Sequence, residues 1–232
     1  MWSQTATMNI TVASANNTPA ITSSSSFSVD ENNISVGVVS ATDIDGDTLV
    51  FSISDTTNFT IDSSTGVISF VNAPDFETKS TYTFSASVSD SQTEANQTIT
   101  ITINNLNDNA PTLQDATYTL SENASVGSTL ATLSATDSDG NLNTITYSIT
   151  SGNDANTFTL DSQSGALKLN STVDYETKNS YTLTIQASDT QNTDSATITV
   201  NITNINDTAP TISGTPTTTI AENSSYSFIP SS

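Results

Sequence analysis

The chain contains the stretch Asp174–Pro210, DYETKNSYTLTIQASDTQNTDSATITVNITNINDTAP, and a close copy of it earlier in the sequence. The copy, at residues 75–111, reads DFETKSTYTFSASVSDSQTEANQTITITINNLNDNAP, so that Asp75 precedes Asp174 by 99 positions. A Glu-Asn pair also recurs, at Glu31-Asn32, Glu122-Asn123 and Glu222-Asn223. A period near one hundred residues predicts two complete repeats in this 232-residue chain.

Within each copy, apolar and polar residues alternate with a period of two, which places one face of a strand in a core and the other in water. The apolar positions are Tyr82, Phe84, Ala86, Val88, Ile99, Ile101 and Ile103 in the first copy, and Tyr181, Leu183, Ile185, Ala187, Ile198, Val200 and Ile202 in the second. Turn signals such as Thr65-Gly66 and Ser164-Gly165 separate the predicted strands. No segment has a sustained helical period.

About seven short strands per hundred residues are typical of an immunoglobulin-like sandwich. The predicted fold is therefore all-β, with two tandem seven-stranded Greek-key β-sandwiches. The predicted boundaries are 19–108 for the first repeat and 109–207 for the second. Residues 1–18 are interpreted as the trailing strand and linker of a preceding repeat, and residues 208–232 as the incomplete start of a third.

The charge balance excludes several classes of function. Asp and Glu number 24 against three Lys, with no Arg or His, so the net charge is −21 and binding to nucleic acid is disfavoured. Without Cys or His the chain lacks the usual ligands of zinc and the usual nucleophile systems, so an enzyme is not expected. No apolar run approaches the roughly 20 residues of a spanning helix, so no membrane insertion is expected within this stretch.

The order of the acidic motifs resembles that of tandem cadherin repeats. The second copy supplies Pro111, Glu122-Asn123, the A-T-D-S-D of 135–139, Asp174-Tyr175-Glu176, the A-S-D of 187–189, and the N-I-N-D-T-A-P of 204–210. The first copy supplies the same set, from Pro19 through the A-T-D-I-D of 41–45 to the N-L-N-D-N-A-P of 105–111. The resemblance implies an extracellular or cell-surface protein in which Ca²⁺ is bound between neighbouring repeats.

The resemblance also implies a ligand set for each junction. At the complete junction it is Glu31, Asp75, Glu77, Asn105, Asn107, Asp108, Asn109, Asp137, Asp139 and Asp189. A partial site near the amino terminus would use Asp43, Asp45 and Asp90, with Asp47 as an extra oxygen ligand, and one near the carboxyl terminus would use Glu122, Asp174, Glu176 and Asp207. Asn105 and Asn204 replace the first Asp of the family's D-x-N-D-N linker, and Thr208 replaces an Asn in the second linker, which weakens the expected binding there.

Elementary electrostatics supports a cation at such clusters. We expect D-x-E and D-x-D on extended backbone to send both carboxylates to one side, about 6 to 7 Å apart. Two like charges at roughly 4 Å repel by about 4 kcal/mol at an effective dielectric near 20, which a cation would reverse. Ca²⁺ accepts six to eight oxygens in flexible geometry and so suits the set better than Mg²⁺. The D-I-D-G-D of 43–47 is not an EF-hand loop, because Thr48 and Ser54 stand where that loop needs Gly and Glu.

The predicted function is a calcium-rigidified extender in a repetitive surface adhesin, which acts in cell adhesion. The Asn/Thr/Ser-rich composition without Cys or Arg favours a bacterial-type adhesin. Its partners would be the neighbouring repeats of the same chain, with another surface protein or a glycan beyond them. Two alternatives stay open: repeats that bind a partner homophilically, and a carbohydrate-binding module of a secreted enzyme. The second is weakened because most aromatic rings, including Phe59 and Phe158, fall at core positions.

Overall fold

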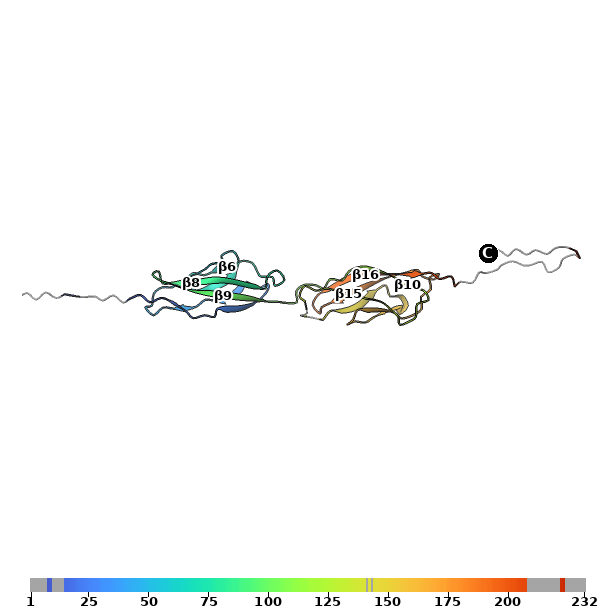
Figure 1. The fold of residues 1–232 in the computed structure, drawn as a ribbon, viewed down its shortest axis with the longest axis horizontal. Helices are drawn as coiled ribbons and strands as arrows, with labels where there is room; N and C mark the ends of the chain where they lie inside the picture. Colours follow the sequence, from blue (N-terminus) through green and yellow to red (C-terminus); the bar gives the residue numbers. More distant parts are fainter. Residues whose placement is uncertain (1–7, 10–14, 141, 143, 208–221, 224–232) are drawn as a thin grey trace, which may run out of the picture. The chain divides into compact units, whose positions relative to one another are not determined.

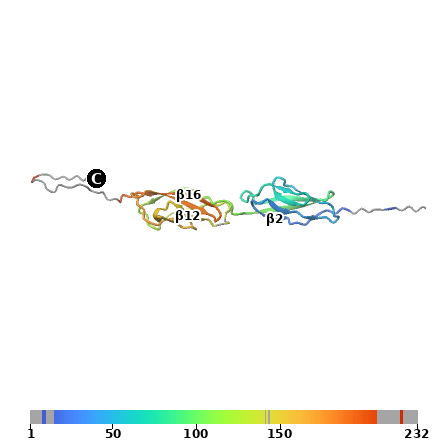
Figure 2. The ribbon, with the colours of Figure 1, turned by 180° about the vertical axis from the view of Figure 1, so that it is seen from behind.

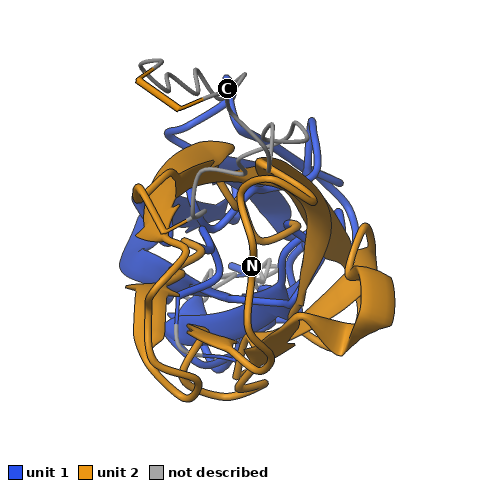
Figure 3. Ribbon diagram, turned by 90° about the vertical axis from the view of Figure 1, so that its right-hand side faces the viewer, with its two compact units in different colours: residues 1–109, 137–143 blue, residues 110–136, 144–232 orange. Residues whose placement is uncertain are grey.

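The computed structural model describes residues 8–9, 15–140, 142, 144–207 and 222–223. It divides into two compact units, each described here by itself (Figure 3). Unit 1 comprises residues 1–109 and 137–143, and unit 2 comprises residues 110–136 and 144–232. Of the expected trailing strand and linker over 1–18, only residues 8–9 and 15–18 are described, and of the expected start of a third repeat over 208–232 only residues 222–223 are. The predicted repeat boundaries stay predictions.

Unit 1 is built from short strands in two main sheets. Its strands are β1 (Ala20–Ile21), β2 (Ser26–Asp30), β3 (Ser35–Val38), β4 (Ala41–Thr42), β5 (Val50–Ile53), β6 (Phe59–Ile61), β7 (Val67–Phe70), β8 (Thr81–Ser89) and β9 (Glu94–Asn104). A four-stranded sheet has the order β2-β9-β8-β5 and a three-stranded sheet the order β3-β7-β6, while β1 pairs with β4. β8 and β9 are the long neighbouring strands of this unit (Figure 1).

Unit 2 repeats this architecture. Its elements are β10 (Ala116–Ser121), β11 (Thr129–Thr132), β12 (Thr146–Ser151), the 3₁₀ turn η1 (Asp154–Asn156), β13 (Phe158–Leu160), β14 (Ala166–Leu169), β15 (Ser180–Ser188) and β16 (Thr193–Thr203). The sheets have the orders β10-β16-β15-β12 and β11-β14-β13. Figure 2 shows β12 and β16 from behind, with β2 of unit 1. Four plus three strands in each unit confirm the predicted seven-stranded, all-β sandwiches.

The first long strand of each unit lies parallel to the last, because the chain crosses over between them. β2 pairs with β9 in parallel and β10 pairs with β16 in parallel, whereas the other pairs are antiparallel. This pairing brings the end of β2 beside the end of β9, with Asp30 opposite Asn104. The residues that follow the two strands, Glu31 and the linker from Asn105, therefore begin at the same end of the sandwich.

The predicted inward residues form the two cores. Every apolar position named above in β8, β9, β15 and β16 is buried, except for Tyr82, which is half-buried. The Tyr82 ring packs edge-on against Phe59 and Phe70, with centroids 5.5 and 5.2 Å apart, and the Nζ atom of Lys79 lies 4.2 Å from its centre. Full burial of each Val, Leu, Ile or Phe side chain in these cores stabilises the fold by about 1.5 to 3 kcal/mol. Tyr147 is also buried, and its hydroxyl accepts a hydrogen bond from Ala135 N at 2.9 Å.

Candidate metal centre

Glu31 follows β2 and is buried, with 2% of its surface exposed. Its Oε2 accepts a hydrogen bond from Phe76 N at 2.8 Å and its Oε1 accepts one from Leu106 N at 2.7 Å. The carboxylate thus joins the D-F-E segment to the linker that follows β9. Each carboxylate oxygen has a second lone-pair site, so both can still coordinate a cation.

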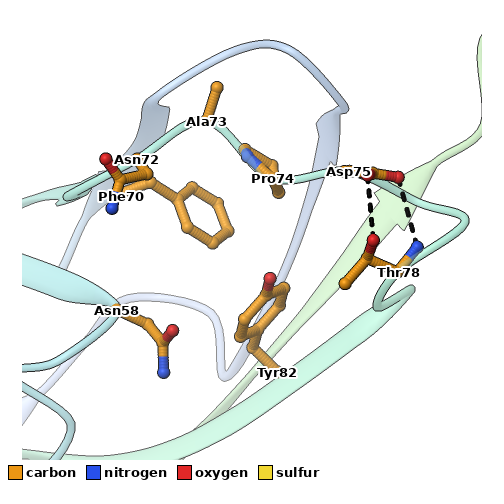
Figure 4. Close-up of a pocket in the computed structure, with 8 residues that line it drawn as sticks. All are labelled: Asn58, Phe70, Asn72, Ala73, Pro74, Asp75, Thr78 and Tyr82. Carbon is orange, nitrogen blue, oxygen red and sulfur yellow. Dashed lines mark hydrogen bonds between the residues drawn. The ribbon is translucent and has the colours of Figure 1, made fainter.

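Asp75 and Glu77 lie on a turn, which corrects the expectation of an extended backbone for D-x-E. Thr78 donates to Asp75 twice, from its backbone nitrogen to Oδ1 at 3.1 Å and from its hydroxyl to Oδ2 at 2.9 Å (Figure 4). These hydrogen bonds, the hydroxyl first, hold the pKa of Asp75 below its usual value, so the group stays ionised. The turn places one oxygen each of Glu31, Asp75 and Glu77 within 4.8 Å of one another.

Asp108 and Asp139 complete a second group with Glu77 inside unit 1, where one oxygen of each again lies within 4.8 Å of the others. Asn109 links the two aspartates. Its backbone nitrogen donates to Asp139 Oδ2 at 3.0 Å, and its side-chain amide donates to Asp139 Oδ1 at 2.8 Å and to Asp108 Oδ1 at 2.9 Å. Asp139 is 3% exposed, and its own backbone nitrogen donates to Asp137 Oδ1 at 3.0 Å, so the D-x-D segment is also a turn.

These side chains line a cavity of about 230 Å³, which we call the acidic cavity. Its lining residues are Glu31, Asn32, Asp75, Glu77, Asp108, Asn109 and Ser138. Glu77 is exposed, and its pKa is raised first by partial loss of hydration and then by the negative charges of Glu31, Asp139 and Asp108. The lysines do not relieve this repulsion: Lys79 and Lys178 lie over Tyr82 and Tyr181, and Lys168 lies on β14. A cation in the acidic cavity would lower the electrostatic energy.

The donor set fits a hard divalent cation. Carboxylate and amide oxygens are the ligands that Ca²⁺ takes in proteins, at six to eight per ion. The linker residue Asn105 adds a buried Oδ1 that has no hydrogen-bond partner among the described residues, while its Nδ2 donates to the backbone oxygen of Asp139 at 3.3 Å. A buried polar atom without a partner is costly, and an ion is one of its usual partners. Asn107 lies half-buried in the same linker.

Asp189 belongs to unit 2, where it is fully buried. Its Oδ1 accepts hydrogen bonds from Gln191 N at 2.8 Å and from Asn192 N at 2.6 Å, which fix the A-S-D turn between β15 and β16. Asp90 is 4% exposed at the same place in unit 1, and its Oδ1 accepts from Gln92 N and Thr93 N at 2.7 and 2.6 Å. These bonds, the Thr93 amide first, hold the pKa of Asp90 far below its usual range.

Near the amino terminus, the structure brings Asp43, Asp45 and Asp47 together, with one oxygen of each within 4.8 Å of the others. Asp90 is not in this group, and its Oδ2 instead accepts from the Asn16 amide at 2.9 Å. Asp45 Oδ2 accepts from the backbone nitrogen of Asn17 at 2.7 Å. Asp43 Oδ2 is buried and has no hydrogen-bond partner among the described residues.

Near the carboxyl terminus, a further acidic group consists of Glu122, Glu176 and Asp207. One oxygen of each lies within 4.8 Å of the others. Glu122 is 8% exposed and accepts hydrogen bonds from the backbone nitrogens of Tyr175, at 2.8 Å, and of Ile205, as Glu31 does in unit 1. Asp174 lies outside this group, and its Oδ2 accepts from the Thr177 hydroxyl at 2.7 Å. Thr208 lies outside the described residues.

Sequence reasoning missed Asn32 and Ser138, which line the acidic cavity. The recurrent Glu-Asn pair was a signal for Asn32, but only its Glu was assigned a role. Ser138 is the residue between the two aspartates of the D-x-D, and its side-chain type gave no signal. Among the described residues, no helix is long and apolar enough to cross a membrane.

Comparison with known proteins identifies the family of this chain. A family model described as the cadherin domain matches residues 25–104 and 116–203. The mouse protein "Cadherin EGF LAG seven-pass G-type receptor 2" is 38% identical over 155 residues, which are 64% of this chain and 5% of that protein. Human "Protocadherin Fat 1" is 33% identical over 200 residues, 79% of this chain and 4% of that protein. The chain therefore spans a small fraction of the length of these relatives.

Solved structures share the fold. Human protocadherin-24 EC1-2 superimposes with a TM-score of 0.71 at 22% identity, covering 82% of this chain and 100% of that one. Mouse cadherin-23 EC22-24 gives a TM-score of 0.72 at 24% identity, covering 83% of this chain and 68% of that one. The two family matches cover more than half of the sequence and coincide with the two observed sandwiches. This chain belongs to the cadherin family, as two tandem cadherin domains.

Proposed function

We propose that these cadherin domains bind Ca²⁺ at the acidic cavity and act as a calcium-rigidified extender in an extracellular adhesion protein. The observation that carries the proposal is the pair of acidic groups that share Glu77, whose pKa is raised by partial loss of hydration and by the like charges around it. The cadherin relatives support cell adhesion at the cell surface as the general function. The extender role and the individual ligands are our proposals.

The acidic residues of the cavity would have different roles. Glu31 would hold an ion while it keeps the D-F-E turn and the linker together through Phe76 N and Leu106 N. Asp108 and Asp139 would supply negative charge from the linker and from the D-x-D turn. When bound, Ca²⁺ supplies the positive charge that cancels the repulsion and draws these segments together. We further propose that Asp137 and Asp189 contribute to the same junction, which would restrict the angle between neighbouring repeats.

The partial sites are proposed as weaker. The group of Asp43, Asp45 and Asp47 and the group of Glu122, Glu176 and Asp207 each offer three carboxylates, and Asp174 and Asp90 are engaged by neighbouring hydroxyl and amide donors. Affinities of about 10⁻⁵ to 10⁻³ M would match extracellular calcium. The bacterial-type source stays a prediction from composition, and the relatives named above are animal proteins.

One observation favours a glycan as a second kind of partner. A recess of about 190 Å³ in unit 1 is lined by Asn58, Asn72, Asp75, Thr78, Tyr82 and neighbouring residues (Figure 4). Amide, carboxylate and hydroxyl groups in this recess can hydrogen-bond the hydroxyls of a sugar beside the Tyr82 ring. However, the Tyr82 ring already packs against Phe59 and Phe70. A glycan array probed in calcium would show binding if this alternative is right, and Tyr82→Ala should then abolish it.

The extender proposal is tested by titration calorimetry and small-angle scattering on the whole chain. We expect calcium to release or absorb heat in the wild type, and chelator to increase the flexibility seen by scattering. The double variant Glu77→Gln with Asp108→Asn should lose most of this binding, whereas Glu94→Gln, an exposed acid on β9 outside the ligand sets, should retain it. A wild type without a calcium signal would contradict the site. Binding with identical scattering curves would contradict the extender.

Sedimentation distinguishes homophilic binding by the repeats from the extender role. If the repeats themselves adhere, the wild type should form dimers in calcium and dissociate in chelator. A strict monomer in calcium would favour the extender over direct adhesion.

A further inference from the structure

The turn after β2 places Asn32 in an uncommon backbone conformation. Its φ is 64°, in the left-handed region that Asn and Gly tolerate best. Its backbone nitrogen donates to Pro74 O at 2.9 Å, next to Asp75 of the D-F-E turn. The backbone of Asn32 is therefore held in place by a segment more than forty residues away in the sequence.

From this turn the Asn32 side chain reaches the linker. Its Nδ2 donates to Oδ2 of Asp108, whose Oδ1 accepts from the Asn109 amide at 2.9 Å. Asp108 is exposed, so packing alone does not choose its rotamer. Two amide donors, one on each oxygen, define the direction of its carboxylate. Each oxygen keeps a second lone-pair site for a cation.

We propose that Asn32 is a positioning residue that holds the Asp108 carboxylate toward the acidic cavity. This inference rests on the calcium site proposed above and assigns Asn32 a role through Asp108, without direct contact to the ion. Carboxylates that bind metals are commonly fixed by such hydrogen bonds, whose loss weakens metal affinity. The Glu-Asn pair then has two functions, because Glu31 would ligate and Asn32 would orient another ligand.

The second repeat contains an internal comparison. Asn123 follows Glu122 as Asn32 follows Glu31, but its φ lies outside the left-handed region. The chain there turns differently, with Ala124 N donating to Ser121 O at 2.9 Å. Among the described residues, the Asn123 side chain has no hydrogen bond to Asp207 or to any other group. The Asn of the Glu-Asn pair therefore makes a hydrogen bond to the linker aspartate in the first repeat only.

The test compares Asn32→Gly with Asn123→Gly in the whole chain, by calcium titration calorimetry. Glycine keeps the left-handed turn at position 32 and removes only the amide. We expect Asn32→Gly to weaken calcium binding by about threefold to tenfold, at or below the range for hydrogen-bond partners of metal ligands because Asp108 is exposed. Asn123→Gly should bind as the wild type does. Equal binding by all three proteins, or tighter binding by Asn32→Gly, would overturn the inference.

A double-mutant cycle shows whether Asn32 affects calcium binding through Asp108. In an Asp108→Asn background, Asn32→Gly should weaken calcium binding no further, because the residue it orients has already lost its charge. A merely structural role would instead lower the melting temperature in chelator and weaken binding equally in both backgrounds, which would overturn the inference. If the wild type itself binds no calcium, the proposed function fails as well. If it binds and Asn32→Gly is unaffected, only the role of Asn32 fails.

Discussion

The carboxylate of Glu31 accepts hydrogen bonds from Phe76 and Leu106, and that of Glu122 accepts them from Tyr175 and Ile205. A buried charge is costly unless it is hydrogen-bonded, and backbone amides satisfy the charge here. Both glutamates also belong to acidic groups. One residue type in each repeat therefore stabilises the end of the sandwich and offers oxygen to a cation.

Glu31→Gln and Glu77→Gln separate these two effects. In chelator we expect Glu31→Gln to lower the free energy of unfolding by about 1 to 3 kcal/mol, because an amide nitrogen then faces a backbone N–H that loses its acceptor. Glu77→Gln should leave that free energy unchanged or raise it, because it removes charge from a repulsive cluster. Urea unfolding measures both, and calcium titration should show weaker binding in each variant. Equal stability of the two variants in chelator would contradict this assignment.

The raised pKa of Glu77 predicts a pH dependence of the calcium-free protein. The folded state binds this proton more tightly than the unfolded chain, so the group favours folding below its ordinary pKa of 4.5. That contribution is lost as the pH rises through the folded pKa. The stability of the wild type relative to Glu77→Gln should therefore fall as the pH rises above 4.5 in chelator. Urea unfolding at several pH values checks this, and a constant difference would contradict it.

At the scale of elements, tight turns between paired strands fix the strand registers of each unit. The turn from β13 to β14 ends at Gly165, with φ of 69°, and a Cβ placed there would lie 2.3 Å from the Leu133 carbonyl oxygen. Leu133 N donates to Gly165 O at 2.9 Å, so this turn is also hydrogen-bonded to the segment after β11. Gly66 has the same role beside Val39 in unit 1.

Gly165→Ala should destabilise the second repeat by about 2 to 4 kcal/mol, from left-handed strain together with the clash against backbone. Gly127→Ala is the matched control, because Gly127 also has a positive φ, of 88°, but a Cβ there meets nothing within 4 Å. Its cost should be about 1 kcal/mol. Urea unfolding of both variants measures the difference. Similar costs would show that strain, rather than the close approach, makes glycine necessary.

At the scale of the molecule, 24 acidic residues against three lysines make self-repulsion large at neutral pH. Part of this charge is gathered into the acidic groups of the two units rather than spread evenly. A ligand that binds only the folded state stabilises it in proportion to the logarithm of its concentration. Stability should therefore depend strongly on divalent cations.

Calcium at about one hundred times its dissociation constant should stabilise the fold by about 2.7 kcal/mol per ion, and melting temperature should rise with it. Magnesium at the same concentration should do less, because it keeps several waters and demands stricter geometry. Thermal melts in chelator, calcium and magnesium check this, with sodium chloride of equal ionic strength as the control for simple screening. An equal rise with all three salts would contradict a specific site.

The alternating residues of β8, β9, β15 and β16 and the recurrent acidic motifs could be predicted from the sequence, because both are local patterns with a fixed spacing. Alternation with a period of two dictates which side chains face the core, although Tyr82, over whose ring Lys79 lies, is only half-buried. The types of ligand expected at each end followed from the resemblance to cadherin repeats. The conformation of D-x-E was predicted wrongly, because Thr78 bonds the Asp75 side chain and closes a turn.

The sequence by itself determined the two repeats, the β class, the core faces and the acidic chemistry, since these depend on residue type and period. Only the tertiary structure decided which acids gather: Asp47 rather than Asp90 joins Asp43 and Asp45, and Asn32 but not Asn123 contacts the linker. The physical reason is that hydrogen bonds between distant segments and the φ of a single turn residue set the side-chain directions. Neither can be read from local spacing, because each depends on where the rest of the chain has folded.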